Sequence, residues 1–88
     1  MSQQEAPGQH KTVTIYVNGR PQTWPKEQIF YEDLVNIFLN GAPSPSNARY
    51  TIVYRNGHSD KPKGKLNPGE SVKAKEDMQF DVDQTIES

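Results

Sequence analysis

The strongest constraint on the fold is an alternating segment that runs straight into a turn. Within residues 12–17 the apolar side chains occupy every second position, at Val13, Ile15 and Val17. This period of two, in β-branched residues, predicts a strand with one buried face. Asn18 and Gly19 follow directly, and this pair tolerates the positive φ of a two-residue hairpin turn. The return strand is predicted over residues 20–24, at a sheet edge, because Pro21 has no N–H to donate.

One amphipathic helix is predicted after the hairpin. Its apolar residues recur at spacings of three and four, as Tyr31, Leu34, Val35, Phe38 and Leu39. Gly41 suits a helix C-cap, and Pro43 and Pro45 prevent the helix from continuing, so we expect about nine residues. Because so short a helix is marginal in water, a sheet must cover its apolar face.

The strands predicted after the helix indicate the fold class. Strands are predicted over residues 50–55, 71–74 and 78–83, and residues 57–68 read as a polar loop. The last strand alternates Met78, Phe80 and Val82 with acidic and amide residues. One helix with strands before and after it in the sequence predicts an α+β fold, with the helix packed on a mixed sheet of four to five strands. In β-grasp folds, which have this layout, the first and last strands pair in parallel at the centre of the sheet.

Composition excludes several classes of function. The chain has 88 residues, 32% of them hydrophobic, which allows one domain with a small core. It has no cysteine and no long apolar run, so we expect no disulfide, no signal peptide, no membrane segment and a cytoplasmic location. A net charge of −1 argues against nucleic-acid binding.

No catalytic, metal or cofactor site is predicted. His10 and His58 are isolated and have no second ligand at metal-binding spacing. Asp81 and Asp83 share one face of a strand, which indicates a solvated exterior better than acid–base catalysis. We therefore predict a protein that is not an enzyme.

Three segments and one surface follow from these patterns. Residues 1–11 are expected to be a disordered leader, residues 12–84 the domain, and residues 85–88 an exposed tail. The tail consists of Thr85, Ile86, Glu87 and Ser88. A candidate partner-binding surface is predicted to include Thr14, Tyr16, Val53, Arg55 and His58. The outer face of the sheet is expected to carry Tyr16, Thr14 and either Thr51 or Val53. Four aromatic residues are open to two interpretations, core or binding face: Tyr16, Trp24, Tyr50 and Tyr54.

Three blocks of sequence resemble the bacterial multiubiquitin domain family. They are KTVTIYVNGR at residues 11–20, YTIVYRNGH at 50–58 and PGESVKAKEDMQFDV at 68–82. The resemblance implies a ubiquitin-like protein modifier of bacterial ubiquitination-like operons. Its implied partners are activating-type, conjugating-type and metal-dependent isopeptidase-type proteins and the amines of target proteins, and we expect it to be a monomer when unconjugated.

The implied chemistry runs through the C-terminal carboxylate, which would be activated and passed through a thioester to a target amine, forming an isopeptide bond on a lysine. Such modifiers usually end in paired glycines, whereas this chain ends in Glu87 and Ser88. Two alternatives therefore remain: an interaction or adaptor module that is not conjugated, and, ranked lower, a sulfur carrier.

Overall fold

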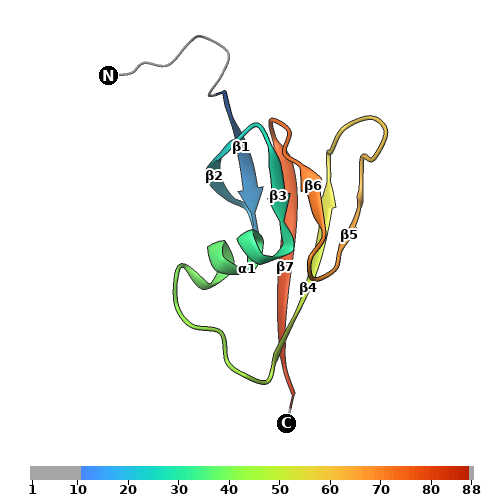
Figure 1. Ribbon diagram of the computed structural model, residues 1–88. Coiled ribbons are helices and arrows are strands. Elements are labelled where there is room, and N and C mark those ends of the chain that lie inside the picture. The colour runs from blue at the N-terminus through green and yellow to red at the C-terminus, as the bar shows by residue number, and fades with distance from the viewer. Residues whose placement is uncertain (1–10, 88) are drawn as a thin grey trace, which may run out of the picture.

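The computed structural model describes residues 11–87, which form one helix and seven strands (Figure 1). In chain order the elements are β1 (Thr12–Val17), β2 (Arg20–Pro25), β3 (Gln28–Phe30), α1 (Tyr31–Leu39), β4 (Ala48–Arg55), β5 (Gly64–Leu66), β6 (Ser71–Lys73) and β7 (Met78–Ile86). Residues 1–10 of the predicted leader lie outside the described residues. Lys11 is joined to the folded body, because its carbonyl accepts a hydrogen bond from the Lys26 N–H at 3.0 Å.

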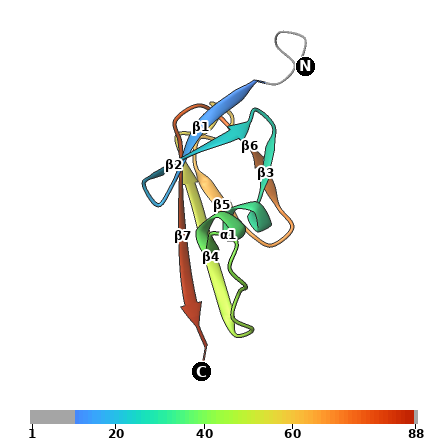
Figure 2. The ribbon, with the colours of Figure 1, turned by 90° about the vertical axis from the view of Figure 1, so that its left-hand side faces the viewer.

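Five strands form one mixed sheet in the order β2-β1-β7-β4-β5. β1 and β7 run parallel, with Ile15 opposite Met78 and Val17 opposite Phe80, and the other neighbouring pairs are antiparallel. α1 packs against one face of this sheet (Figure 2). The arrangement confirms the predicted α+β, β-grasp fold, with its parallel central pair and with β2 at an edge.

The ends of α1 follow from its local sequence. The Phe30 N–H donates to Asp33 Oδ2 at 2.9 Å, so an acid in the first turn satisfies one of the backbone groups left free at a helix start. At the other end Asn40 and Gly41 have φ values of 55° and 82°, a left-handed conformation that Asn and Gly adopt most readily. The Asn40 N–H returns to the Ile37 carbonyl at 3.0 Å, which closes the helix.

The core fills the space between α1 and the inner face of the sheet. Its buried residues are Val13, Ile15, Val17, Ile29, Leu34, Ile52, Tyr54, Leu66, Val72, Ala74, Met78, Phe80 and Val82. Among the four aromatic residues left open above, Tyr54 is buried, while Trp24 and Tyr50 are half-buried against the core. Tyr16 lies on the opposite face of the sheet, so these rings do not form one binding surface.

Two of the short strands are not predicted by the sequence pattern. β3 pairs with β6 in a separate two-stranded ladder, and β5 pairs with the edge of β4. β3 and β5 are three residues long, too short for an alternation to show, and each is formed by pairing with a distant segment.

β4 and β7 extend beyond their neighbours at one end of the sheet (Figures 1 and 2). β1 follows β7 only as far as Phe80, and β5 follows β4 only as far as Ile52. Beyond these points residues 48–51 and 83–86 pair only with each other, and we call them the β4–β7 ribbon. The ribbon carries the C-terminal end of the described chain away from the main body of the core.

Candidate functional site

The predicted C-terminal tail is, in its described part, a continuation of the sheet. Thr85 and Ile86 belong to β7 and pair with β4, whereas Ser88 lies outside the described residues. The side chains of Thr85, Ile86 and Glu87 are exposed, and 51% of Ile86 is accessible. The strand therefore extends past the predicted boundary at residue 84, while its end remains accessible to a partner.

Glu87 is fastened to the beginning of β4 by three contacts. Its N–H donates to the Asn47 carbonyl at 3.0 Å, and its own carbonyl accepts from Asn47 Nδ2 at 2.6 Å. Its carboxylate forms an ion pair with Arg49 Nε at 2.8 Å. An exposed hydrogen bond contributes about 0.5–1.5 kcal/mol and an exposed ion pair about 0.2–1 kcal/mol. Glu87, the last described residue, is therefore held weakly against β4.

Asn47 and Arg49 are functional candidates that the sequence pattern did not indicate. Asn47 lies 40 positions before Glu87 and Arg49 lies 38 positions before it, so no local pattern indicates the pairing. One weak signal was present in the sequence: the apolar alternation of β7 is interrupted by Gln84 and returns at Ile86, which shares the inward-facing parity of Val82.

The inner face of the ribbon is supported by Tyr50. Its ring packs edge-on against Phe38 of α1, with centroids 6.0 Å apart. Its hydroxyl is 2.7 Å from Ser44 Oγ and accepts from Gln84 Nε2 at 3.1 Å. The Tyr31 hydroxyl donates to the Tyr50 carbonyl at 3.4 Å. These contacts attach the ribbon to the helix and to the loop that follows it.

Tyr31 has a pKa above the usual value for a tyrosine. Partial burial raises the pKa of the Tyr31 phenol, and the neighbouring charges of Glu32 and Tyr50 raise it further. The hydrogen bond to the Tyr50 backbone acts in the opposite direction and lowers it. Because burial and like charge dominate, the neutral phenol is favoured at this position.

The outer face of the sheet brings together four of the five predicted surface residues. Thr14 and Tyr16 alternate with the buried residues of β1, and Val53 and Arg55 alternate with the buried residues of β4. Gln79 of β7 lies between Tyr16 and Arg55, so the three side chains form a row across three strands. Arg55 Nη1 forms an ion pair with Asp81, the neighbour of Gln79 on this face. Val53 is 40% exposed, which makes this face polar with one aliphatic residue.

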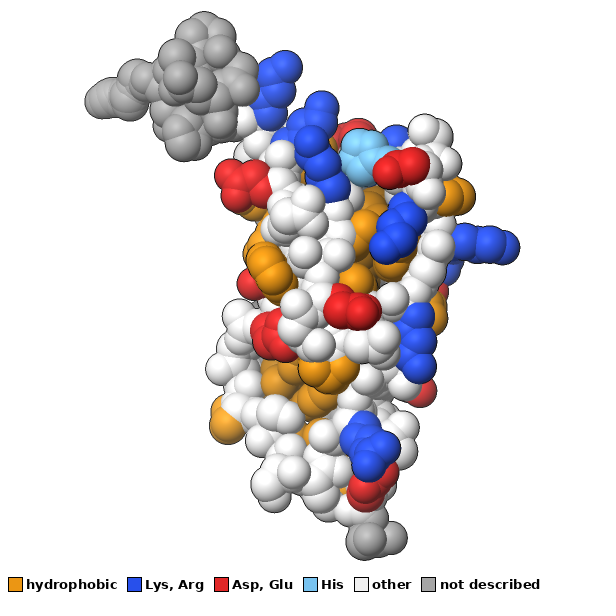
Figure 3. Space-filling view, turned by 45° about the vertical axis from the view of Figure 1, so that its right-hand side comes forward, with side chains coloured by type: hydrophobic (Ala, Val, Ile, Leu, Met, Phe, Trp, Pro, Cys, Tyr) orange, Lys and Arg blue, Asp and Glu red, His pale blue; other side chains and the backbone are white. Residues whose placement is uncertain are grey.

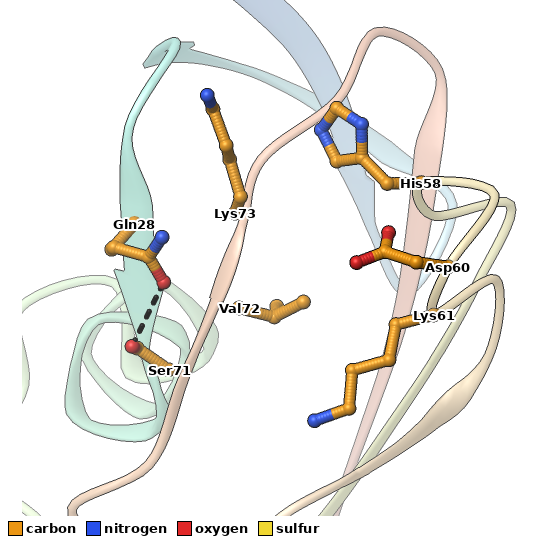
Figure 4. Close-up of a pocket in the computed structure, with 7 residues that line it drawn as sticks. All are labelled: Gln28, His58, Asp60, Lys61, Ser71, Val72 and Lys73. Carbon is orange, nitrogen blue, oxygen red and sulfur yellow. Dashed lines mark hydrogen bonds between the residues drawn. The ribbon is translucent and has the colours of Figure 1, made fainter.

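His58, the fifth predicted residue, lies elsewhere. It lines a hollow of about 460 Å³ between the loop after β4 and the β3–β6 ladder. Asp60 and Lys61 from that loop face Val72 across the hollow (Figure 4). Figure 3 shows the histidine beside acidic and basic side chains, near a depression with a hydrophobic floor. His58 Nε2 is buried without a hydrogen-bond partner among the described residues.

The described residues offer no metal or membrane-spanning feature. No three histidine, aspartate or glutamate side chains within residues 11–87 come together as ligands for a metal ion. No helix in this part of the chain is both long and apolar enough to cross a bilayer.

A helix packed on a mixed sheet whose first and last strands are parallel neighbours defines a β-grasp domain of the ubiquitin-like class. The sequence model of the multiubiquitin family matches residues 13–86. The chain therefore belongs to the multiubiquitin family, as its sequence blocks indicated. Searches of the curated proteins and of the solved structures found no match.

Proposed function

We propose that the protein is a ubiquitin-like modifier that is activated at its C-terminal carboxylate by an activating-type enzyme. The carboxylate attacks the α-phosphate of ATP and pyrophosphate leaves, which gives an acyl-adenylate. A cysteine thiolate of the enzyme then displaces AMP to form a thioester. A lysine amine of the target attacks the thioester carbonyl and releases the thiol, so that an isopeptide bond remains. The modifier supplies the carboxylate and a docking surface, and other proteins supply the catalysis.

One observation carries this proposal: β7 leaves the core along the ribbon, and its last described residues are exposed. Thr85, Ile86 and Glu87 are exposed at the end of the ribbon. Membership in the multiubiquitin family supports the same function. An enzyme that gripped the ribbon would have the carboxyl end within its reach without unfolding the core.

The outer face of the sheet is the proposed recognition surface for the partner proteins. Thr14, Tyr16, Val53 and Arg55 offer hydroxyl, aromatic, aliphatic and guanidinium groups on one side of the molecule. The proposed partners are activating-type, conjugating-type and metal-dependent isopeptidase-type proteins of a bacterial cytoplasm. His58 does not belong to this surface.

A non-conjugated adaptor is the second candidate, and a specific observation favours it. Asn47 and Arg49 hold Glu87 against β4, so this last described residue is not free to extend into solvent.

An experiment that removes only the C-terminal carboxylate distinguishes the modifier from the adaptor. The full chain is incubated with an activating-type enzyme and ATP, and intact mass spectrometry detects the enzyme thioester. A semisynthetic chain that ends in a Ser88 carboxamide is the matched control, because it keeps every side chain and lacks the reactive acid. The modifier function requires a thioester with the acid and none with the amide. Equal binding of both forms without a thioester would support the adaptor.

A further inference from the structure

One side of β7 is left without a neighbouring strand in the ribbon. β1 ends opposite Phe80, and at the next inward-facing position, Val82, the backbone of β7 is hydrogen-bonded by the Asn18 side chain instead of by a strand. Asn18 Oδ1 accepts from the Val82 N–H at 2.8 Å, and Asn18 Nδ2 donates to the Val82 carbonyl at 3.1 Å. Asn18 thus imitates one residue of a strand, and beyond Val82 no described strand lies on this side.

The register shows which backbone groups face the vacant side. Glu87 and Asn47 are opposite each other and hydrogen-bonded through their backbones. In an antiparallel pair the hydrogen-bonded positions alternate, so the odd-numbered residues of β7 bond to β4. Gln84 and Ile86, like Val82, direct their N–H and C=O groups away from β4. We call these four backbone groups the open β7 edge.

We propose that the open β7 edge binds an extended strand of a partner protein in which basic and apolar residues alternate. A strand added beside β7 satisfies the four backbone groups, as in other cases of strand addition. Its alternate side chains lie beside Ile86 on the inner face and beside Asp83 on the outer face. Ile86 is 51% exposed and offers an apolar contact.

The carboxylate of Asp83 is the reason to expect basic residues in the partner strand. Asp81 and Glu87 each have an arginine from β4 as an ion-pair partner. Asp83 lies between them on the same face, and within residues 11–87 it has no ion-pair partner. A lysine or arginine on the added strand would supply the missing positive charge across from Asp83.

A second copy of this chain is a poorer occupant. The antiparallel register that satisfies the open β7 edge of both copies places Gln84 of one opposite Ile86 of the other. That register also places Asp83 opposite Glu87 of the second copy, in both halves of the pair. Like charges directly opposite destabilise strand pairing, and inward or flanking charges are a common protection of sheet edges against self-association.

The test uses a synthetic peptide, (Lys-Val) repeated three times, titrated into the full ¹⁵N-labelled chain. Amide NMR shifts should concentrate at Gln84, Ile86 and the adjoining residues of β7, and hydrogen exchange at Gln84 and Ile86 should slow. The control peptide carries N-methyl groups on its backbone, keeps the charges and cannot complete the ladder. Equal binding of the control peptide would overturn the proposal, as would shifts centred on the hollow around His58.

Two substitutions test the backbone and charge components separately. Ile86→Pro removes the N–H at the open edge and spares the N–H groups that bond to β4, and we expect peptide affinity to fall about tenfold or more. Asp83→Asn should weaken binding by about two- to fivefold, whereas the matched variant Asp60→Asn should leave it unchanged. Unchanged affinity in the Asp83→Asn variant would refute the basic strand even if the proline variant misfolds.

Strand binding at the open β7 edge can be tested independently of the modifier function. Peptide binding is measured without an activating enzyme or ATP, so a missing thioester leaves the strand-addition result standing. If the unlabelled chain itself, added without peptide, shifts Gln84 and Ile86 in a concentration-dependent way, the occupant is a second copy and the proposed partner is wrong.

Discussion

Release of Glu87 from β4 can be measured directly by disrupting the two side-chain contacts that hold it. The double variant Asn47→Ala, Arg49→Ala removes the 2.6 Å hydrogen bond and the 2.8 Å ion pair and leaves the backbone bond from Glu87 N–H to the Asn47 carbonyl. The ion-paired side chains are 75% and 51% exposed, so both contacts belong at the weak end of their ranges. Together they contribute about 1 kcal/mol, which corresponds to roughly a fivefold change in the opening equilibrium.

The assay is amide hydrogen exchange at Glu87, whose N–H is protected only while it is bonded to Asn47. Exchange should accelerate roughly fivefold in the double variant, whereas exchange at Phe80 in the core should not change, because the opening is local. Arg55→Ala is the matched control, since it breaks a similarly exposed ion pair in the body of the sheet. An unchanged exchange rate at the Glu87 amide, or an equal acceleration at the Phe80 amide, would refute the inference that Asn47 and Arg49 hold Glu87 locally. Under the proposed modifier function, thioester formation should rise by up to the same factor, because the enzyme binds the released end.

Three further predictions concern the body of the domain. Asn18→Gly keeps the positive φ of the turn and removes the two hydrogen bonds to Val82, so the free energy of unfolding measured in urea should fall by about 1–3 kcal/mol. Asn18→Asp keeps the acceptor for the Val82 N–H, so its free energy of unfolding should fall by less. Gly64→Ala would place a Cβ 2.7 Å from the hydroxyl oxygen of buried Tyr54 and should cost about 1–3 kcal/mol, with a smaller cost in a Tyr54→Phe background; equal costs in the two backgrounds would exclude that contact as the cause. The raised pKa of Tyr31 means that the folded state holds this proton more tightly than the unfolded state, so the stabilisation is complete below the unfolded pKa of about 10 and is lost as pH rises through the folded pKa. Tyr31→Phe should flatten the part of the stability profile above about pH 10, and a profile identical to that of the parent chain would contradict this prediction.

Much of the fold could be predicted because its signals are local. The alternation in β1, the Asn18-Gly19 turn and the helical spacing over residues 31–39 each depend on neighbours within a few positions. Pro21 indicated an edge strand for the same reason, since a missing N–H is a property of the residue itself. The central pairing of β1 with β7 was expected from the β-grasp fold, and their apolar faces suit that central position.

The candidate site was predicted only in part. Thr14, Tyr16 and Val53 lie on the outer face as expected, because strand alternation decides which side a residue faces, and Arg55 lies on the same face. His58 follows β4 in a loop, where no periodicity fixes its direction, and the structure places it beside the β3–β6 ladder. Whether the outer face binds the proposed partners stays a prediction.

The sequence by itself determined a small α+β domain with one helix, a hairpin and a known inner face for each long strand. The tertiary structure alone decided how far β7 runs, that Asn47 and Arg49 hold Glu87, and that Gln84 and Ile86 face a side of the sheet on which no described strand lies. The physical reason is the range of the interactions. Periodicity and turn chemistry act between neighbours in the chain, whereas a strand's end and its open edge depend on where distant partners stop.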